Sequence, residues 1–205
     1  MTRRRTERGF TLIEVMMALA ILTVGAVGIL SLQQAATRGN SEARQMTLAT
    51  EVNRAWLERI RRDSLMWTGT AAGSRAATQY LVRLPANGTT DWFVPVPAAP
   101  TESYGFDWFG RDTRDNTAIR YCTQARLTWL VPEINANSAP PSVQVDVRTW
   151  FHRRGYARDN IQSDLSLFDN CSLGSPADVD AEIRAANSRI KSVTGTLVLR
   201  PVPPR

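Results

Sequence analysis

The sequence is poor in the residues from which catalytic and metal sites are most often built. It has one histidine, His152, and two cysteines, Cys122 and Cys171, in 205 residues. Zinc and iron–sulfur sites need clusters of these side chains at short spacing, so such metal centres are excluded. His152 is followed by Arg153 and Arg154, and no serine or cysteine has an identifiable base partner. We therefore predict that the chain is not an enzyme and has no cofactor.

Lysine is also nearly absent, because Lys191 is the only one, and arginine supplies almost all of the positive charge. The formal net charge is +6. Four arginines and one glutamate give residues 1–9 a charge of +3, so half of the net charge lies in a short leader. The basic balance is thus partly a targeting feature, and it carries little information about partners.

A long apolar run follows this leader. From Phe10 to Leu32 the only ionisable residue is Glu14. A helix of about 23 residues spans about 35 Å, which is enough for a hydrocarbon core of about 30 Å. We predict a transmembrane helix over residues 10–32. The basic leader stays in the cytoplasm by the positive-inside rule, so the residues after Leu32 emerge on the other side of the membrane.

A removable secretory signal is the alternative interpretation of this run. Residues 33–36 read Gln-Gln-Ala-Ala and offer no good cleavage site, and the one small-x-small triplet, at residues 18–20, lies inside the apolar core. A twin-arginine signal is also disfavoured, because no apolar pair follows the arginines of the leader. These details favour a retained anchor.

The segment Arg8-Gly9-Phe10-Thr11-Leu12-Ile13-Glu14-Val15 resembles the class III signal of type IV pilins and type II secretion pseudopilins. The resemblance implies cleavage between Gly9 and Phe10 by a prepilin peptidase, and N-methylation of Phe10. It also implies partners, namely other pilins or minor pilins and the inner-membrane assembly platform. Residues 19–33 are similar to the helix of PilV-type minor pilins and of their I-type pseudopilin relatives, although the helix-bending proline of many major pilins is missing near Ser31.

Glu14 poses a physical problem that does not depend on the family. An acidic residue at the centre of a membrane helix costs about 2.5–3.5 kcal/mol, so it needs a compensating partner. Cleavage before Phe10 would create an ammonium group, and the ammonium of a neighbouring subunit is one such partner. The alternatives are that Glu14 lies in the headgroup layer, or pairs with the terminus of its own chain. With the surrounding motif we favour the role between subunits.

The helical pattern continues beyond the membrane segment, over residues 33–67. An apolar stripe at three-to-four spacing is formed by Leu48, Ala49, Val52, Ala55, Trp56 and Ile60. We expect this stripe to pack on a sheet, with Gly39 as a point where the helix is interrupted. Charged residues occupy the other positions, and Arg54 and Glu58 are spaced to pair. A solvated face is favoured over a DNA-binding patch.

Residues 68–205 are predicted to form a soluble, β-rich head. Residues 68–117 form a connection whose aromatic side chains either contact a partner or cap the core, and capping is favoured. Asp112, Asp115 and Asn116 fit no EF-hand spacing, so a calcium site is disfavoured.

Alternating apolar residues predict strands over 119–131 and 143–151, joined by a long loop over 132–141. The intervening polar residues, with Asp146 among them, are expected on the outer face of the sheet. A third strand is expected over 192–200, and a helix from Pro176 to about Asn187 with Ser175 as its N-cap.

Two cysteines in a head that leaves the cytoplasm favour a disulfide between Cys122 and Cys171. It would close about 50 residues and contribute about 4 kcal/mol in the loop-entropy model. It is similar to the disulfide loop of pilins, although that loop usually lies nearer the chain end.

Together these features predict an α+β, pilin-like fold, with a long N-terminal helix, transmembrane in its first half, packed on an antiparallel sheet. The predicted function is that of a minor pilin that takes part in assembly or tip priming of a type IV pilus. It would reside in the inner membrane with its head in the periplasm, and then in the pilus. Two alternatives stay open: a minor pseudopilin of a type II secretion system, and a DNA-uptake or adhesion module.

Overall fold

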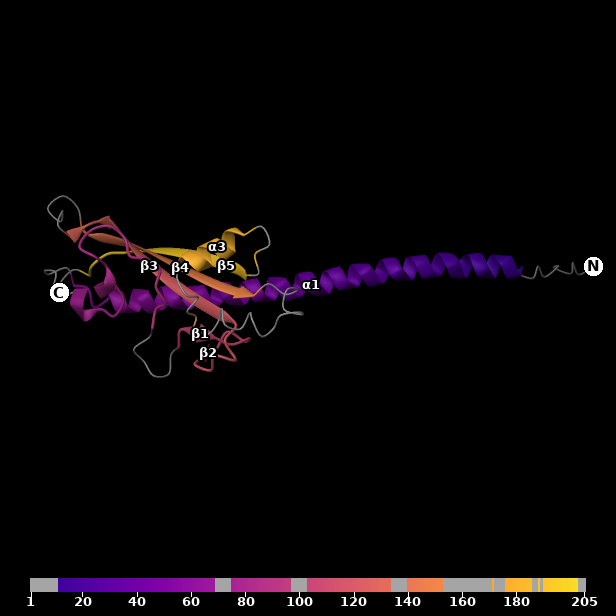
Figure 1. Cartoon of the computed structure of the whole chain (residues 1–205), viewed down its shortest axis with the longest axis horizontal. Helices are drawn as coiled ribbons and strands as arrows, with labels where there is room; N and C mark the ends of the chain where they lie inside the picture. Colours follow the sequence, from indigo (N-terminus) through magenta and orange to yellow (C-terminus); the bar gives the residue numbers. More distant parts are fainter. Residues whose placement is uncertain are drawn as a thin grey trace, which may run out of the picture. The chain divides into compact units, whose positions relative to one another are not determined.

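A computed structural model describes residues 11–68, 75–96, 103–133, 140–152, 171, 176–185, 188 and 190–202. The chain divides into two compact units, Met1–Arg44 and Gln45–Arg205. The long helix α1 (Leu12–Ser64) contributes its first part to one unit and its second part to the other (Figure 1). The remaining elements form a head with one sheet, so the predicted α+β class with a long N-terminal helix is confirmed.

Helix α1 continues without a break through Gly39, so the expected interruption there is wrong. A single glycine costs a helix about 1 kcal/mol relative to alanine. Residues on both sides of Gly39 keep their helical conformation. Thr37 also bonds within the helix, because its hydroxyl donates to the carbonyl of Gln33 at 2.9 Å. One unfavourable residue is too little to end a helix of 53 residues.

The sheet of the head has the strand order β2-β1-β3-β4-β5, with every neighbouring pair antiparallel. Its strands are β1 (Gly105–Phe106), β2 (Asp112–Thr113), β3 (Tyr121–Val131), β4 (Ser142–His152) and β5 (Ile190–Leu199). The three long strands lie within two residues of the predicted ranges. The loop between β3 and β4 also falls where it was predicted.

The main core lies between the sheet and the second part of α1. Ala49, Val52, Trp56 and Ile60 are buried against alternate residues of β3 and β4, such as Leu127 and Val145. The predicted stripe is therefore largely confirmed, but Ala55 is exposed. Asn53 also lies on the buried face of the helix, one turn after Ala49. It is 2% exposed and was not expected in the core.

The opposite face of α1 is charged and exposed, as predicted. The ion pair on this face joins Glu58 to Arg61 at 3.7 Å, one turn along the helix, and not the expected pair of Arg54 and Glu58. Both side chains of the pair are more than half exposed, so it adds little to stability.

The second face of the sheet is covered, which contradicts the prediction that its polar residues lie outside. Asp146 and Arg148 are 5% and 4% exposed, respectively. The reason is that helix α3 (Pro176–Arg184) and the half-buried Trp92 pack over this face. Helix α3 begins where predicted and ends at Arg184, before Asn187, while Ser175 lies outside the described residues.

The connection before β3 holds the two short strands β1 and β2 and two 3₁₀ turns, η1 (Arg75–Ala77) and η2 (Leu81–Arg83). Isolated bridges join Thr89 to Thr128 and Phe93 to Ala125, so this segment runs beside β3. Phe106 is buried and Phe93 packs against the same core. These two aromatic residues cap the core, whereas Phe109 is 60% exposed.

Candidate functional site

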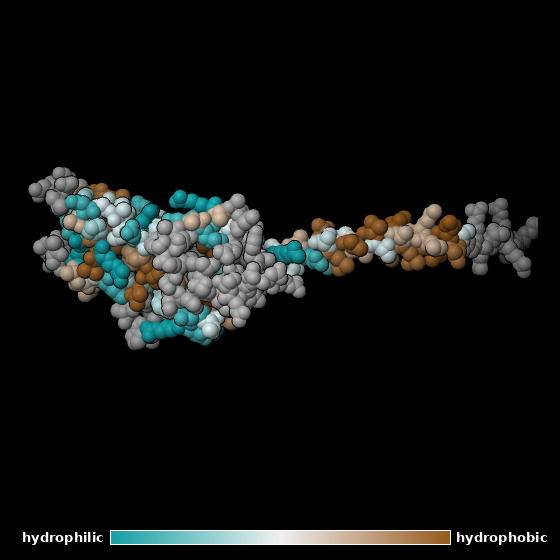
Figure 2. All heavy atoms as spheres, in the orientation of Figure 1, coloured by the Kyte–Doolittle hydropathy of each residue, from teal (hydrophilic) through white to brown (hydrophobic). Residues whose placement is uncertain are grey.

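The first part of α1 is an apolar surface with no protein packed against it among the described residues. Its mean hydropathy reaches 2.4 over 18 residues, none of which is buried. It is the one helix in the described ranges that is long and apolar enough to cross a membrane. Figure 2 shows apolar side chains along this part of the helix. The exposed large apolar residues are Leu12, Ile13, Val15, Met16, Met17, Leu19, Ile21, Leu22, Val24, Val27, Ile29, Leu30 and Leu32.

Polar side chains inside this apolar segment bond to the helix itself. The hydroxyl of Thr23 donates to the carbonyl of Ala20 at 2.8 Å, and the hydroxyl of Ser31 donates to the carbonyl of Gly28 at 2.8 Å. Such bonds satisfy a hydroxyl group without water, which is what a hydrocarbon environment requires. The segment is thus compatible with a bilayer along its whole apolar length.

Glu14 and Thr11 form a capping box at the start of this helix. The Glu14 Oε2 atom accepts hydrogen bonds from the backbone N–H and the hydroxyl of Thr11, each at 3.0 Å. In return, the backbone N–H of Glu14 donates to Thr11 Oγ1 at 3.4 Å. This reciprocal arrangement satisfies donors that the first helical turn leaves open. Thr-x-x-Glu is a spacing by which such a box can be recognised in a sequence, so this contact was predictable from Thr11 and Glu14 alone.

The capping box occupies one oxygen of the Glu14 carboxylate. Within the described part of the chain, the hydrogen bonds of this side chain all involve Oε2, which leaves Oε1 open to a further donor. The residues of the expected cleavage site, Gly9 and Phe10, lie outside the described residues, so their processing stays a prediction. Glu14 therefore caps the helix of its own chain through Oε2, while Oε1 can accept a hydrogen bond from another group.

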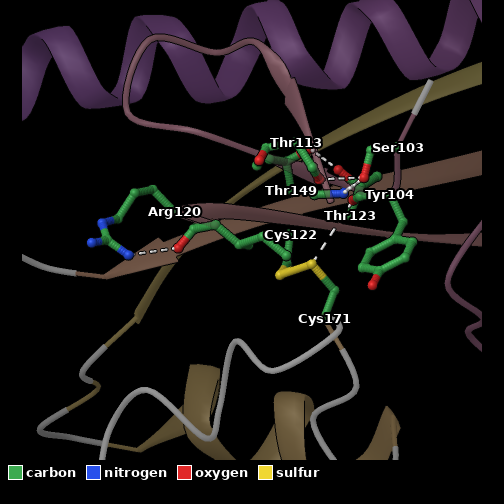
Figure 3. Close-up of a disulfide and its surroundings, with 10 residues drawn as sticks. Ser103, Tyr104, Thr113, Arg120, Cys122, Thr123, Thr149 and Cys171 are labelled. Carbon is green, nitrogen blue, oxygen red and sulfur yellow. Dashed lines mark hydrogen bonds between the residues drawn. A yellow bond between two sulfur atoms is a disulfide. The ribbon is translucent and has the colours of Figure 1, made fainter. Parts of the chain in front are cut away.

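In the head, a disulfide joins Cys122 of β3 to Cys171, 49 residues later (Figure 3). The two Cα atoms are 5.3 Å apart, and both cysteines are fully buried. They belong to a second apolar cluster with Trp150, Val179 of α3 and Ile190. Figure 3 shows Tyr104 beside the disulfide, where its carbonyl oxygen lies 3.8 Å from the sulfur of Cys171. The disulfide thus ties the residues before α3 to the centre of the sheet.

Arg148 lies at the centre of a polar layer on the same face. Its guanidinium donates to Oε1 of Gln124 from Nε and Nη2, at 2.9 and 2.6 Å, and pairs with the carboxylate of Asp180 on α3. The ring of Trp92 lies 4.1 Å from the Arg148 carbon Cζ. Burial lowers the pKa of Arg148, while the bond to Asp180 opposes this effect. These contacts attach α3 and the connection to the sheet.

Asp146 is a second centre of the layer and joins three strands. Its carboxylate accepts bonds from Arg126 of β3, Gln144 of β4 and Thr196 of β5, each at 2.9 Å. Burial alone would raise the pKa of this carboxyl group, but the hydrogen bonds and the charge of Arg126 outweigh it. The pKa of Asp146 is therefore lowered below its usual value.

The metal-ligating side chains of the head are dispersed among the described residues. No group of three or more metal-ligating side chains occurs among them. Asp112 pairs with Arg59 at 2.7 Å, and Asp115 accepts hydrogen bonds from the N–H and hydroxyl of Thr117 at 2.9 and 2.7 Å. His152 lines a small hollow of about 20 Å³ together with Gln45, Trp108, Arg120, Tyr121 and Phe151.

Comparison with known families points to the N-terminal segment. Residues 4–30 match the family described as the prokaryotic N-terminal methylation motif. No curated protein and no solved structure matches the chain. The match includes Gly9, Phe10 and Glu14, and covers the apolar part of the helix up to Leu30. The chain therefore carries a type IV pilin-like class III signal at the start of its membrane-anchoring helix.

Proposed function

We propose that this chain is a minor pilin, a structural subunit that helps to assemble or prime a type IV pilus. The class III signal makes it a type IV pilin-like or pseudopilin protein, and the motif implies processing by a prepilin peptidase and assembly with other pilins. The observation that carries the proposal is the signal in frame with a 53-residue helix whose second part packs on an antiparallel sheet.

Processing would change the charge at the start of the helix. In the precursor, the arginine-rich leader, residues 1–9, stays in the cytoplasm. Cleavage between Gly9 and Phe10 removes side chains with a net charge of +3 and creates a new α-ammonium group on Phe10 in place of the one on Met1, and this group is then methylated. This ammonium lies at the edge of the apolar segment, where an uncompensated charge is costly.

Glu14 supplies the compensating charge in the proposed assembly. Its Oε2 atom stays bound to Thr11, while Oε1 accepts the ammonium of a neighbouring subunit. Because the carboxylate is fixed by the capping box, the pair also fixes how far one helix is displaced along the other. The apolar side chains that contact lipid before assembly would then contact the helices of other subunits.

Membership in a filament can be tested directly. Filaments are sheared from cells, separated from membranes and probed for this chain. We expect a small amount of the mature chain in the filament fraction and a reservoir in the inner membrane. A chain that stays entirely in the membrane, while filaments form normally without it, would contradict the proposal.

A minor pseudopilin of a type II secretion system is the second candidate, because it shares every feature of the N-terminal segment. Deletion of the gene for this chain distinguishes the two candidates, when surface filaments and secretion are both measured. Loss of surface filaments with normal secretion supports the pilus. Accumulation of secreted enzymes in the periplasm, with normal filaments, supports the secretion system.

A DNA-uptake or adhesion module is the third candidate. The exposed face of α1 carries Arg54 and Arg61, but Glu51 and Glu58 lie among them and Glu58 pairs with Arg61. This mixture of charges weakens attraction to phosphate. DNA contact would show as binding whose affinity falls steeply with salt concentration. Binding of the full chain in detergent to duplex DNA, measured from low to physiological salt, decides this candidate.

A further inference from the structure

A tight hairpin turn between β1 and β2 has no role in the proposed processing and pairing. Asp107 holds this turn: its backbone N–H donates to the carbonyl of Arg111 at 2.9 Å, and its carbonyl accepts from the N–H of Gly110 at 3.1 Å. Its carboxylate oxygen Oδ1 accepts from the backbone N–H groups of Phe109 and Arg111, at 2.8 and 2.9 Å. Four hydrogen bonds within five residues leave the turn little conformational freedom.

The turn is also fixed to the rest of the head. Gly110 has a φ of 76°, which a side chain disfavours, and its Cα lies against α1, where a Cβ would be 3.5 Å from Leu48. Next to the turn, Asp112 pairs with Arg59 of α1 at 2.7 Å and accepts from the backbone N–H of Ser103 at 2.9 Å. The hairpin is thus attached both at its tip and at its base.

This rigid turn presents an aromatic ring to solvent. Phe109 is 60% exposed, and it is the one aromatic residue among the exposed large apolar side chains of the described ranges. The guanidinium of Arg111 lies over the ring, with Cζ 5.4 Å from the ring centroid. Aromatic residues and arginine are enriched in protein interfaces, and a preorganised pair loses little entropy on binding.

The charged side chains around Phe109 differ in whether they have a partner in the described part of the chain. Asp107 is bound by the backbone of the turn, Asp112 by Arg59, and Asp115 by the N–H and hydroxyl of Thr117 at 2.9 and 2.7 Å. Each nearby carboxylate therefore has a partner, whereas Arg111 is exposed and forms no ion pair within the described part of the chain. A surface that complements this tip must be apolar and must carry a carboxylate.

We propose that the hairpin tip, defined as Phe109 and Arg111, is a docking anchor for another subunit of the same filament. The partner surface is an apolar depression that takes the Phe109 ring and carries an aspartate or glutamate at its rim for Arg111. This inference rests on the proposed function, because it takes the partner from among the subunits of the assembly.

Photo-crosslinking from position 109 tests the proposal in cells that assemble the filament. The full-length chain carries p-benzoylphenylalanine in place of Phe109, which keeps an aromatic ring at the tip. We expect an adduct with a different subunit, mapped by mass spectrometry to a segment that contains aspartate or glutamate. An adduct only within the same chain, or no adduct while the chain is present in filaments, overturns the proposal.

Charge reversal tests the partner's chemistry. Arg111→Glu should lower the adduct yield about tenfold, because it places like charges together, whereas Arg111→Lys should keep most of it. Reversal of the partner's acidic residue to arginine should restore the adduct of the Glu variant. Equal yields for Arg111→Glu and Arg111→Lys would overturn the assignment of an acidic partner.

Two controls separate this test from a failure of the proposed function. The same crosslinker at Val82, which is 50% exposed on another part of the head, should give a yield that does not depend on Arg111. Leader cleavage and recovery in the filament fraction are measured in parallel. A chain that is absent from filaments contradicts the proposed function, whereas a chain that is present without the position-109 adduct contradicts only the docking anchor.

Discussion

Asn53 of α1 and Gly195 of β5 lie in direct contact at the centre of the head. A Cβ atom on Gly195 would overlap with Oδ1 of Asn53, and would lie 2.9 Å from Leu57 Cδ1. The Asn53 side chain is buried and held by hydrogen bonds. Its Nδ2 atom donates to the carbonyl of Val147 at 2.8 Å, with further acceptors at Val193 O (3.3 Å) and Thr149 Oγ1 (3.4 Å). One buried amide thus fixes the distance between the helix and two strands.

This contact predicts that Gly195→Ala destabilises the head. The added methyl group must displace Asn53 or separate β5 from α1, which should lower the free energy of unfolding by about 1–3 kcal/mol. Chemical denaturation of the full chain in detergent measures the change. The control is Gly39→Ala, because a Cβ there meets no atom within 4 Å and alanine favours the helix. Equal stabilities for Gly195→Ala and wild type would contradict the close packing.

The buried disulfide predicts a second loss of stability. Replacing both cysteines, as Cys122→Ala with Cys171→Ala, should lower the free energy of unfolding by about 2–5 kcal/mol, because the cross-link no longer restrains the unfolded chain. A reducing agent should destabilise the wild type by a similar amount and leave the double variant unchanged. Two free thiols in the chain isolated from membranes or filaments would contradict the bond.

The lowered pKa of Asp146 implies that the free energy of unfolding decreases at acidic pH. Its pKa is lower in the folded state than in the unfolded chain, where it is about 3.9, so the ionised carboxylate stabilises the fold above that pH. Asp146→Asn should cost about 1–3 kcal/mol at neutral pH. The difference from wild type should shrink as the pH falls below about 4, through the folded-state pKa. The exposed Asp91→Asn serves as the control, and a difference independent of pH would contradict the assignment.

The two roles of Glu14 can be separated by three variants. Glutamine retains the capping box with Thr11 but has no charge, whereas alanine loses both, and Thr11→Ala loses the cap but keeps the charge. If Glu14 pairs with a neighbouring ammonium, Glu14→Gln and Glu14→Ala should both abolish recovery in filaments, and Thr11→Ala should reduce it less. Normal incorporation of Glu14→Gln would show that capping is the only role. All three variants should still insert in the membrane.

The sequence predicted the fold well where the signal is local. The alternation of apolar residues located β3 and β4, because the period of a strand is visible in any half-buried sheet. The long helix followed from its length and apolar periodicity. The capping box was also readable, from the spacing of Thr11 and Glu14.

What the sequence did not predict depends on contacts between distant segments. Arg148 and Asp146 were placed on an outer face because nothing local reveals that α3 and Trp92 cover them. Asn53 lies on the buried stripe of α1, but its partners are 94 to 140 residues away. The sequence also does not predict the hairpin tip, because tertiary packing decides that Phe109 is exposed while Phe106 is buried.

We propose that cleavage of the leader creates the ammonium group that Glu14 of a neighbouring subunit binds. Mass spectrometry of the mature chain, isolated from filaments and membranes of its natural host, tests this most directly. We expect a mature chain that begins at Phe10 and carries a methyl group on its α-amino nitrogen. A mature chain that keeps residues 1–9, or begins at any residue other than Phe10, would contradict it.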